Sequence, residues 1–295
     1  MEEDKKEEML GNNPSEARNR KFVLFILFVF LSVTTFLPSF AFANSDLPVT
    51  IIYKINDPYM TVNGKKFEID PVTRAVPVII KEWGRSVVPI RSLVETLGGS
   101  VGWDSKERKV SISFKDSFME LWIDNPKVRI DGVYLWIDDN NHNVKPLIIN
   151  GRTMMPLRFV AENLGCKVMW SSELQTINIT FPAPVIQLES KEIVKSVNDN
   201  ETVVVNIPIA NPFNFQIKIK IKLITQDCPE NWSCDFCIKN ACYFKEGEIV
   251  LEKKEKTTIQ VSIYTVKASN ANFTLKVFNN EIPEEIFYIS LKEDG

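Results

Sequence analysis

The chain has 295 residues, of which 44% are hydrophobic and 25% are charged. This balance is ordinary for globular protein, and the length predicts two or three domains. The formal net charge of −3, with lysines and acidic residues interspersed, gives no reason to expect a nucleic acid or an anionic membrane surface as partner.

A targeting segment is predicted at the start of the chain. Residues 1–21 are polar and end in basic side chains, residues 22–38 form an apolar run, and Ala41-Phe42-Ala43 offers a cleavage site. This order is typical of a signal peptide, although residues 22–43 are also long enough for an uncleaved signal anchor. We favour cleavage. Under either interpretation residues 1–21 form a cytoplasmic leader, and the chain after Asn44 is exported to the cell surface or the exterior.

One stretch of sequence occurs twice in the exported part. Residues 87–114 return as residues 154–181, in one register and without a gap. The pairs of identical residues are Pro89 and Pro156, Arg91 and Arg158, Glu95 and Glu162, Leu97 and Leu164, Gly98 and Gly165, Val101 and Val168, Trp103 and Trp170, Ser105 and Ser172, Ile112 and Ile179, and Phe114 and Phe181. A repeat of this length predicts two copies of a small domain, at residues 46–118 and 119–181.

Each copy predicts a helix followed by a β-hairpin. Apolar residues recur at helical spacing before Gly98 and Gly165, which suit left-handed C-caps, and then alternate along two short strands. Because the helix face and the hairpin face must cover each other, we expect an α+β fold in which each copy packs a small antiparallel sheet on one helix. Only Lys115-Asp116-Ser117 separates the copies, so the two are expected to form a stiff pair that shares strands across the boundary.

The repeated polar and aromatic residues are predicted to be structural. Arg91 stands four residues before Glu95, as Arg158 does before Glu162, which predicts an ion pair along each helix. A substrate clamp is the alternative for the arginines. The tryptophans Trp103 and Trp170 lie on the apolar side of their hairpins and are therefore expected in the core.

These residues carry a family resemblance. The pattern P-[IL]-R-x-[LV]-x-E-x-L-G-x-x-V-x-W, with the upstream turns Gly84-Arg85-Ser86 and Gly151-Arg152-Thr153, resembles the copper amine oxidase N-terminal domain-like module. The resemblance covers roughly residues 48–181. It implies a stalk-type domain that occurs in tandem in secreted bacterial proteins, that folds as a short antiparallel sheet on one helix, and that is not itself catalytic.

A third domain is predicted at residues 185–295. Pro182-Ala183-Pro184 ends the repeat region, and the following sequence alternates between apolar and polar residues without helical spacing. About seven short strands separated by turns predict an all-β sandwich of immunoglobulin-like type.

Four of the five cysteines lie close together in this third domain. They are Cys228, Cys234, Cys237 and Cys242. In an exported protein they favour disulfides, for which we expect the pairing Cys228–Cys234 and Cys237–Cys242 because it closes two successive short loops. A zinc site with four thiolate ligands is the alternative. Cys166 is left over and is expected to be a partly buried free thiol.

No cofactor, metal or catalytic residue is predicted. A copper amine oxidase holds its metal with several histidines, whereas this chain has only His142. Asp138 and Asp139, in the same turn, offer oxygen ligands for calcium, but without the EF-hand order they favour a solvated turn.

The strand around residues 133–137 is apolar on both faces. Val133, Leu135 and Ile137 lie on one face, and Tyr134 and Trp136 on the other. Only one face can meet the helix of its own copy, so the other contacts the neighbouring copy, a protein or a glycan. We predict that Trp122, Tyr134 and Trp136 form the binding surface if the chain has one.

The sequence therefore predicts a non-enzymatic protein of the cell envelope that binds or spaces, with an envelope polymer or a surface protein as partner. The membrane is a partner only if residues 22–43 stay uncleaved. A carbohydrate-active enzyme or its accessory, which needs paired carboxylates in a cleft, is one alternative. A structural subunit that assembles through open sheet edges is the other.

Overall fold

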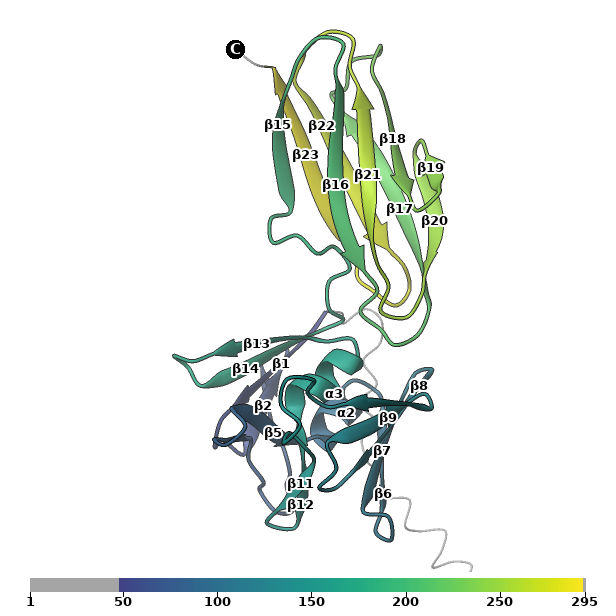
Figure 1. Ribbon diagram of the computed structural model, residues 1–295. Helices are drawn as coiled ribbons and strands as arrows, with labels where there is room; N and C mark the ends of the chain where they lie inside the picture. The colour runs from purple at the N-terminus through teal and green to yellow at the C-terminus, as the bar shows by residue number, and fades with distance from the viewer. Residues whose placement is uncertain (1–47, 294–295) are drawn as a thin grey trace, which may run out of the picture. The chain divides into compact units, whose positions relative to one another are not determined.

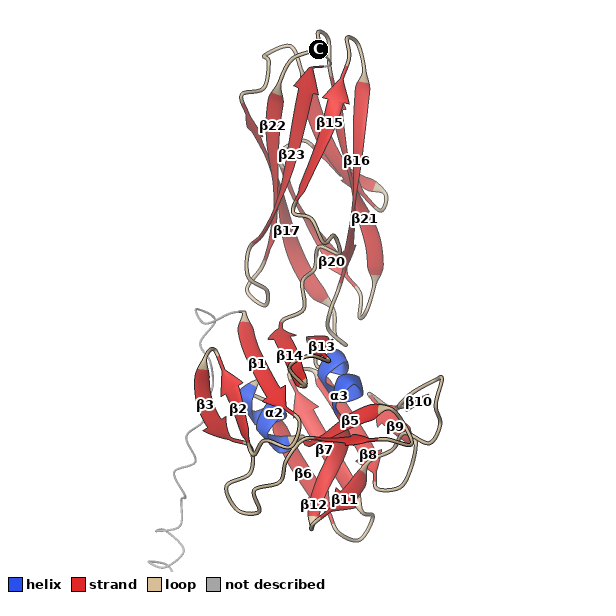
Figure 2. Ribbon diagram, turned by 90° about the vertical axis from the view of Figure 1, so that its left-hand side faces the viewer, coloured by secondary structure: helices blue, strands red, loops and turns tan. Residues whose placement is uncertain are grey.

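The computed structural model describes residues 48–293, so the segments predicted at residues 1–21 and 22–43 lie outside the described part. Its two helices, α2 (Arg91–Thr96) and α3 (Leu157–Asn163), are only six and seven residues long. Most of the remaining structure is antiparallel sheet (Figures 1 and 2). The fold is therefore mostly β. The antiparallel sheets of the predicted α+β class are present, but the helices are too short for the fold to be called α+β. No helix between residues 48 and 293 has the length and apolar content needed to cross a bilayer.

The two sequence copies contribute seven strands each. The first copy contains β1 (Val49–Lys54), β2 (Tyr59–Val62), β3 (Lys65–Glu68), β4 (Val78–Ile80), β5 (Arg85–Pro89), β6 (Ser100–Asp104) and β7 (Lys109–Phe114). The second contains β8 (Ser117–Trp122), β9 (Lys127–Ile130), β10 (Val133–Trp136), β11 (Leu147–Ile149), β12 (Arg152–Pro156), β13 (Lys167–Ser171) and β14 (Thr176–Phe181). They form three sheets, ordered β13-β14-β1-β2-β3, β10-β9-β8-β7-β6 and β11-β12-β5-β4.

Every one of these sheets contains strands from both copies. The turn at Lys115 and Asp116 is so short that β7 continues directly into β8 as its antiparallel neighbour. The hairpin of the first copy therefore pairs with the early strands of the second, and the hairpin β13–β14 pairs with β1. The predicted sharing of strands is confirmed. The expectation of one separate helix-backed sheet in each copy is wrong, because each copy's hairpin finds its partner strands in the other copy.

Two arginines tie the copies together a second time. Arg85 of the first copy donates from Nε to Asp138 in the second, 2.8 Å away. Arg152, its repeat equivalent, donates from Nη2 to Asp70 in the first copy at 3.2 Å. Both aspartates also accept hydrogen bonds from backbone N–H groups of their own turns. The arginine of each Gly-Arg turn thus anchors a loop of the opposite copy through the aspartate of that loop.

The predicted ion pairs on the helices are present. Arg91 donates to Glu95 at 3.0 Å and Arg158 to Glu162 at 3.1 Å. Each arginine also donates to a carbonyl of the following strand, that of Val101 or of Val168. The arginines therefore fasten each helix to its hairpin.

Trp103 and Trp170 are not in the core, contrary to the expectation from their alternation. Their exposed fractions are 44% and 40%. Val110 and Ile177, the residues directly opposite them in the hairpins, are buried. Both tryptophans lie on the outermost strand of a sheet, β6 or β13, where the hydrophobic core no longer covers the strand fully.

The third domain is a sandwich of two sheets, as predicted. The sheets are ordered β15-β23-β22-β17-β20 and β16-β21-β18-β19 and lie face to face (Figure 1). Their strands are β15 (Glu192–Val197), β16 (Thr202–Ala210), β17 (Ile217–Gln226), β18 (Ser233–Ile238), β19 (Ala241–Tyr243), β20 (Glu246–Leu251), β21 (Lys256–Tyr264), β22 (Ala271–Phe278) and β23 (Glu285–Glu293). Alternating residues of β17, from Ile217 to Leu223, are buried, and the lysines between them are exposed.

One of the two expected disulfides is present. Cys237 and Cys242 lie opposite each other on β18 and β19 and are bonded. Cys228 and Cys234 are thiols in the structure, so the second expected bridge is absent, although the two lie near enough for Cys228 to influence the pKa of Cys234. Cys166 is a buried thiol, and burial raises its pKa far above the ordinary value.

Helix α3 ends against residues of the sandwich. Lys254 donates to the carbonyl of Glu162 at 2.7 Å, and Asn214 donates to that of Asn163 at 2.9 Å. The last carbonyls of a helix have no partner within it, so these side chains cap α3. Burial lowers the pKa of Lys254 to about 8 despite the nearby Glu162.

Candidate functional site

The residues Trp122, Tyr134 and Trp136, hereafter the aromatic row, share the outer face of the sheet β10-β9-β8-β7-β6. The strand register places Tyr134 opposite Arg129 and Trp136 opposite Lys127. Trp122, on β8, stands opposite Lys109 on β7, the strand that flanks β8 on the side away from β9. Because directly paired residues of antiparallel strands point to the same face, the row and these three cations form one surface.

The aromatic rings and the cations are in contact. The rings of Trp122 and Tyr134 stack with centroids 6.3 Å apart and planes 25° apart. Lys127 Nζ lies 4.7 Å from the centroid of Trp136, Lys109 Nζ lies 5.9 Å from Trp122, and Arg129 Cζ lies 6.0 Å from Tyr134. Such contacts hold the rings at defined angles.

Glu120 holds two of these cations in position. Its side chain is nearly buried and forms ion pairs with Arg129 and with Lys109, the latter at 3.2 Å. Burial acts to raise the pKa of Glu120, but the hydrogen bonds from Arg129 and Lys109 outweigh it and lower the pKa. The carboxylate therefore stays charged and fixes both cations beside the rings.

The sequence identified the three aromatic residues but missed Lys109, Glu120, Lys127 and Arg129. Lys127 and Arg129 could have been found from the two-residue turn Asp131-Gly132. This turn sets the register of β9 and β10, and the register places Arg129 opposite Tyr134 and Lys127 opposite Trp136. To predict Lys109 and Glu120 as part of the site, one would need to know that β7 pairs with β8, and this pairing crosses the boundary between the copies.

The first copy lacks the aromatic row. Strands β2 and β3 pair in the same register as β9 and β10, so Lys66 takes the place of Tyr134 and Glu68 that of Trp136. Likewise, β1 and β2 pair as β8 and β9 do, and Lys54 takes the place of Trp122. The same architecture thus forms with charged residues at all three positions, and the aromatic side chains are not required for the fold.

A depression of about 350 Å³ adjoins the aromatic row. It is lined by Glu82, Trp83, Asp124, Pro126, His142, Asn143 and Lys145. The His142 ring stacks on Trp136 with centroids 3.8 Å apart and planes 9° apart, so the depression and the row share one wall. Asp138, offered above as a calcium ligand, is engaged by Arg85 and by two N–H groups of its turn.

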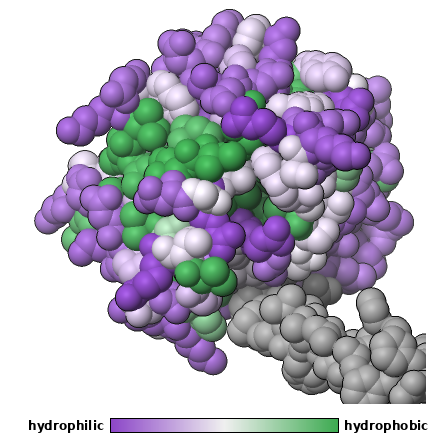
Figure 3. Space-filling view, turned by 90° about the horizontal axis from the view of Figure 1, so that it is seen from below, coloured by the Kyte–Doolittle hydropathy of each residue, from purple (hydrophilic) through white to green (hydrophobic). Residues whose placement is uncertain are grey.

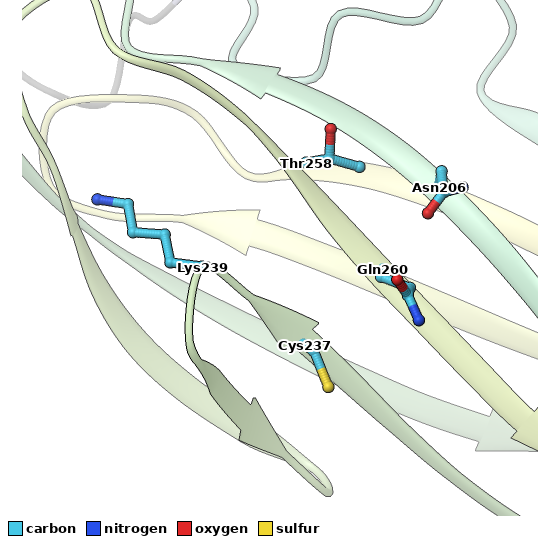
Figure 4. A pocket seen from close by; sticks show the side chains of 5 residues that line it. All are labelled: Asn206, Cys237, Lys239, Thr258 and Gln260. Atoms are coloured by element: carbon cyan, nitrogen blue, oxygen red, sulfur yellow. The ribbon is translucent and has the colours of Figure 1, made fainter.

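A second depression, of about 410 Å³, lies on the outer face of the sandwich. Asn206, Thr258, Gln260 and Cys237 come from neighbouring strands, and Lys239 comes from the turn after β18 (Figure 4). Lys239 is already paired with Glu255 at 2.8 Å, and Cys237 is bonded to Cys242. The depression therefore offers mainly amide and hydroxyl groups.

An apolar area is visible on the face of the molecule seen in Figure 3, bordered by hydrophilic side chains. Two isoleucines of the sheet β11-β12-β5-β4, Ile79 and Ile148, are exposed. Unlike the aromatic row, these two aliphatic side chains offer no polar atom or ring that would orient a ligand.

The copper amine oxidase N-terminal domain family matches the sequence at residues 45–112, 61–179 and 136–214. Together these overlapping matches span residues 45–214 of 295, more than half of the chain. No curated protein matches the sequence.

Three solved structures resemble 37% of the chain each. A family 123 glycoside hydrolase from Clostridium perfringens is 10% identical with a TM-score of 0.28, and the chain spans only 24% of its length. The PapD-like domain 7 of human CEP192 is 10% identical, is covered over 85% of its length and has a TM-score of 0.25. The N-terminal domain of PorA is 16% identical, is covered over 91% and has a TM-score of 0.26. At these scores the likeness carries no argument about function.

The family name refers to copper, and the residues of this chain do not fit that metal. Its single histidine, His142, is stacked on Trp136. Within residues 48–293, no three histidine, cysteine, aspartate or glutamate side chains come together as a set of metal ligands. A copper site built on imidazole nitrogens therefore has no counterpart in the described part of the chain.

Proposed function

Because the chain belongs to the copper amine oxidase N-terminal domain family, we propose that it is a non-catalytic binding protein of the cell envelope. In this proposal the repeat region presents the aromatic row to an envelope glycan, and the immunoglobulin-like sandwich spaces that surface from other parts of the envelope. The apolar segment at residues 22–43 directs export, and it holds the protein at the membrane if it is not cleaved.

The observation that carries the proposal is the difference between the two copies. A surface that the fold needs would recur in both, whereas aromatic residues replace Lys54, Lys66 and Glu68 only in the second. Of the three rings, that of Tyr134 is the most exposed, at 60%, and it suits the apolar face of a sugar ring. The neighbouring lysines and arginine supply donors for hydroxyl or acidic groups. Nearly parallel rings at Trp122 and Tyr134 favour a ligand with repeated units.

A carbohydrate-active enzyme is the alternative from another class. It requires two carboxylates that face one bond of the substrate. Glu95 and Glu162 are each paired with an arginine on their own helix. Glu120, the nearly buried acid beside the row, is held as a carboxylate by two cations and suits a structural role better than that of a general acid.

Pull-down of the protein with purified cell-wall glycan tests the proposal. The test variant carries Trp122→Lys, Tyr134→Lys and Trp136→Glu, the residues that the first copy has at the equivalent positions. We expect the bound fraction to fall about tenfold or more, because each lost stacking contact contributes roughly 1 kcal/mol. A control variant, Phe244→Ser, removes an exposed aromatic side chain of the sandwich and should bind as the unmodified chain does.

Equal binding by the triple variant and the unmodified chain would remove the aromatic row as the site. Hydrolysis of wall glycan by the unmodified chain would favour the enzyme instead.

A further inference from the structure

Within residues 48–293, strand β10 is a sheet edge that no other strand covers. It is the terminal strand of the sheet β10-β9-β8-β7-β6 and reads Val-Tyr-Leu-Trp, with no charged residue or proline. Val133, Tyr134 and Leu135 are 54%, 60% and 45% exposed, so both faces of the strand meet solvent. Proteins usually protect such edges with lysine, proline or a covering segment, because an open edge pairs with other strands.

The first copy shows that protection at the same place. Its equivalent strand, β3, is also the last of its sheet and reads Lys-Lys-Phe-Glu. Lys65 and Lys66 stand where the second copy has Val133 and Tyr134. Since one sequence carries both versions of one edge, the apolar version is not a requirement of the fold.

The hairpin geometry defines which backbone groups of β10 are available. Asp131 and Gly132 both have positive φ and close a two-residue turn, which makes Ile130 and Val133 a hydrogen-bonded pair. Such pairs alternate along the ladder, and Ile137 accordingly donates to the carbonyl of Pro126 at 2.9 Å. The N–H and C=O groups of Tyr134 and Trp136 therefore point away from β9, toward the open side.

We propose that two copies of this chain pair through β10, antiparallel and about a two-fold axis perpendicular to the sheet. The axis passes beside Leu135, so that Leu135 of one copy faces Leu135 of the other. Tyr134 then exchanges two hydrogen bonds with Trp136 of the second copy, and the symmetric pair exchanges two more. In this register the outward groups of Tyr134 and Trp136 all find partners, and the outer faces of the two copies lie on the same side.

The partner that best fits the open edge of β10 is the same strand of a second copy. An uncharged apolar strand brings no like charges together when it pairs with itself, and it places Tyr134 beside an aromatic residue. The protein already uses this arrangement internally, because β5 and β12 pair antiparallel with the repeat-equivalent residues Val88 and Met155 directly opposite. Pairing through β10 also joins two aromatic rows on one face, which would raise the avidity for a polymer.

Disulfide trapping in the full-length chain tests this register. Leu135→Cys places two thiols opposite each other in a non-hydrogen-bonded pair, where Cα atoms approach within the range of a disulfide. The matched control is Val133→Cys, on the same face and similarly exposed, which would face Ile137 of the second copy. After mild oxidation, we expect about fivefold more linked dimer from Leu135→Cys than from Val133→Cys or from the unmodified chain.

A second variant separates pairing from misfolding. Tyr134→Lys in the Leu135→Cys chain introduces the residue that β3 carries at this position, and it should lower linked dimer about fivefold with unchanged circular dichroism, because like charges on the edge oppose pairing. The proposal would be overturned if Leu135→Cys and Val133→Cys gave equal amounts of linked dimer. It would also be overturned if Tyr134→Lys left the amount of linked dimer from Leu135→Cys unchanged. So would a Leu135→Cys chain that links only to a different protein. No glycan is present, so the outcome is independent of the proposed function.

Discussion

Two equivalent glycines show how one residue position acquires a second role. Gly98 and Gly165 both follow their helices with φ of +85° and +89°, a conformation that L-residues with a side chain rarely adopt. A Cβ at Gly98 would meet nothing within 4 Å, whereas one at Gly165 would lie 2.6 Å from Cδ1 of Phe213. The second glycine therefore serves the contact with the sandwich as well as the helix cap.

Replacing each glycine with alanine should separate the two roles. Gly98→Ala is expected to destabilise by about 1 kcal/mol, the strain of a left-handed alanine. Gly165→Ala adds overlap with the ring of Phe213 and should cost roughly 1–3 kcal/mol more. Urea unfolding measures both, and equal losses would show that Phe213 moves aside without cost.

The environment of the Asp70 carboxylate leads us to expect that part of the folding stability is lost at low pH. Partial burial acts to raise its pKa, but hydrogen bonds from Arg152, Thr73 and Val72 outweigh it and lower the pKa to about 2. A depressed pKa means that the stabilisation is complete above the ordinary aspartate value and is lost as the pH falls toward 2.

Asp70→Asn should therefore destabilise the protein by about 1–3 kcal/mol at pH 7, because it removes a charged acceptor. The free-energy difference between the unmodified chain and the variant should shrink when unfolding is measured at pH 4, 3 and 2. A difference that stays constant over this range would contradict the assignment.

At the scale of elements, the alternation of residues predicted the strands well and their burial less well. The alternation predicts strands at residues 50–54 and 59–62. Strand β2 has these limits and β1 begins one residue earlier, because a period of two is a local property of the sequence. Burial is not local. Trp103 follows the apolar alternation but lies on the outermost strand, where the core ends, and the sequence of one hairpin does not specify which strand will be outermost.

A pair of substitutions measures this difference. Trp103→Ala should cost about 1–2 kcal/mol, since the side chain is half exposed. Phe114→Ala, on the next strand, should cost about 3–5 kcal/mol, because the ring is buried and packs edge-on against Phe181 with centroids 5.6 Å apart. Thermal unfolding of both variants decides the order, and a larger loss for Trp103→Ala would show that the strand is covered.

The candidate site was predictable only in part for a related reason. An apolar pattern on both faces of β10 identifies Tyr134 and Trp136 without any knowledge of the fold. The cations that contact the rings come from two other strands, β7 and β9, and β7 belongs to the opposite copy. Long-range pairing decided their positions, and the sequence indicated it only through the short turn at Lys115 and Asp116.

At the scale of the whole molecule, the exchange of hairpins makes the two copies interdependent. Without the second copy, β1 has no β14 beside it and β7 has no β8, so two long strands become open edges and lose their cover. A fragment of residues 46–118 should therefore show no cooperative unfolding as a monomer, whereas residues 46–181 should unfold in one transition. Circular dichroism during heating, with sedimentation to define the mass, distinguishes the two. A dimer of the short fragment would be consistent, since each chain can give its hairpin to the other. A folded monomer would contradict it, because it would show that the first copy needs no strand from the second.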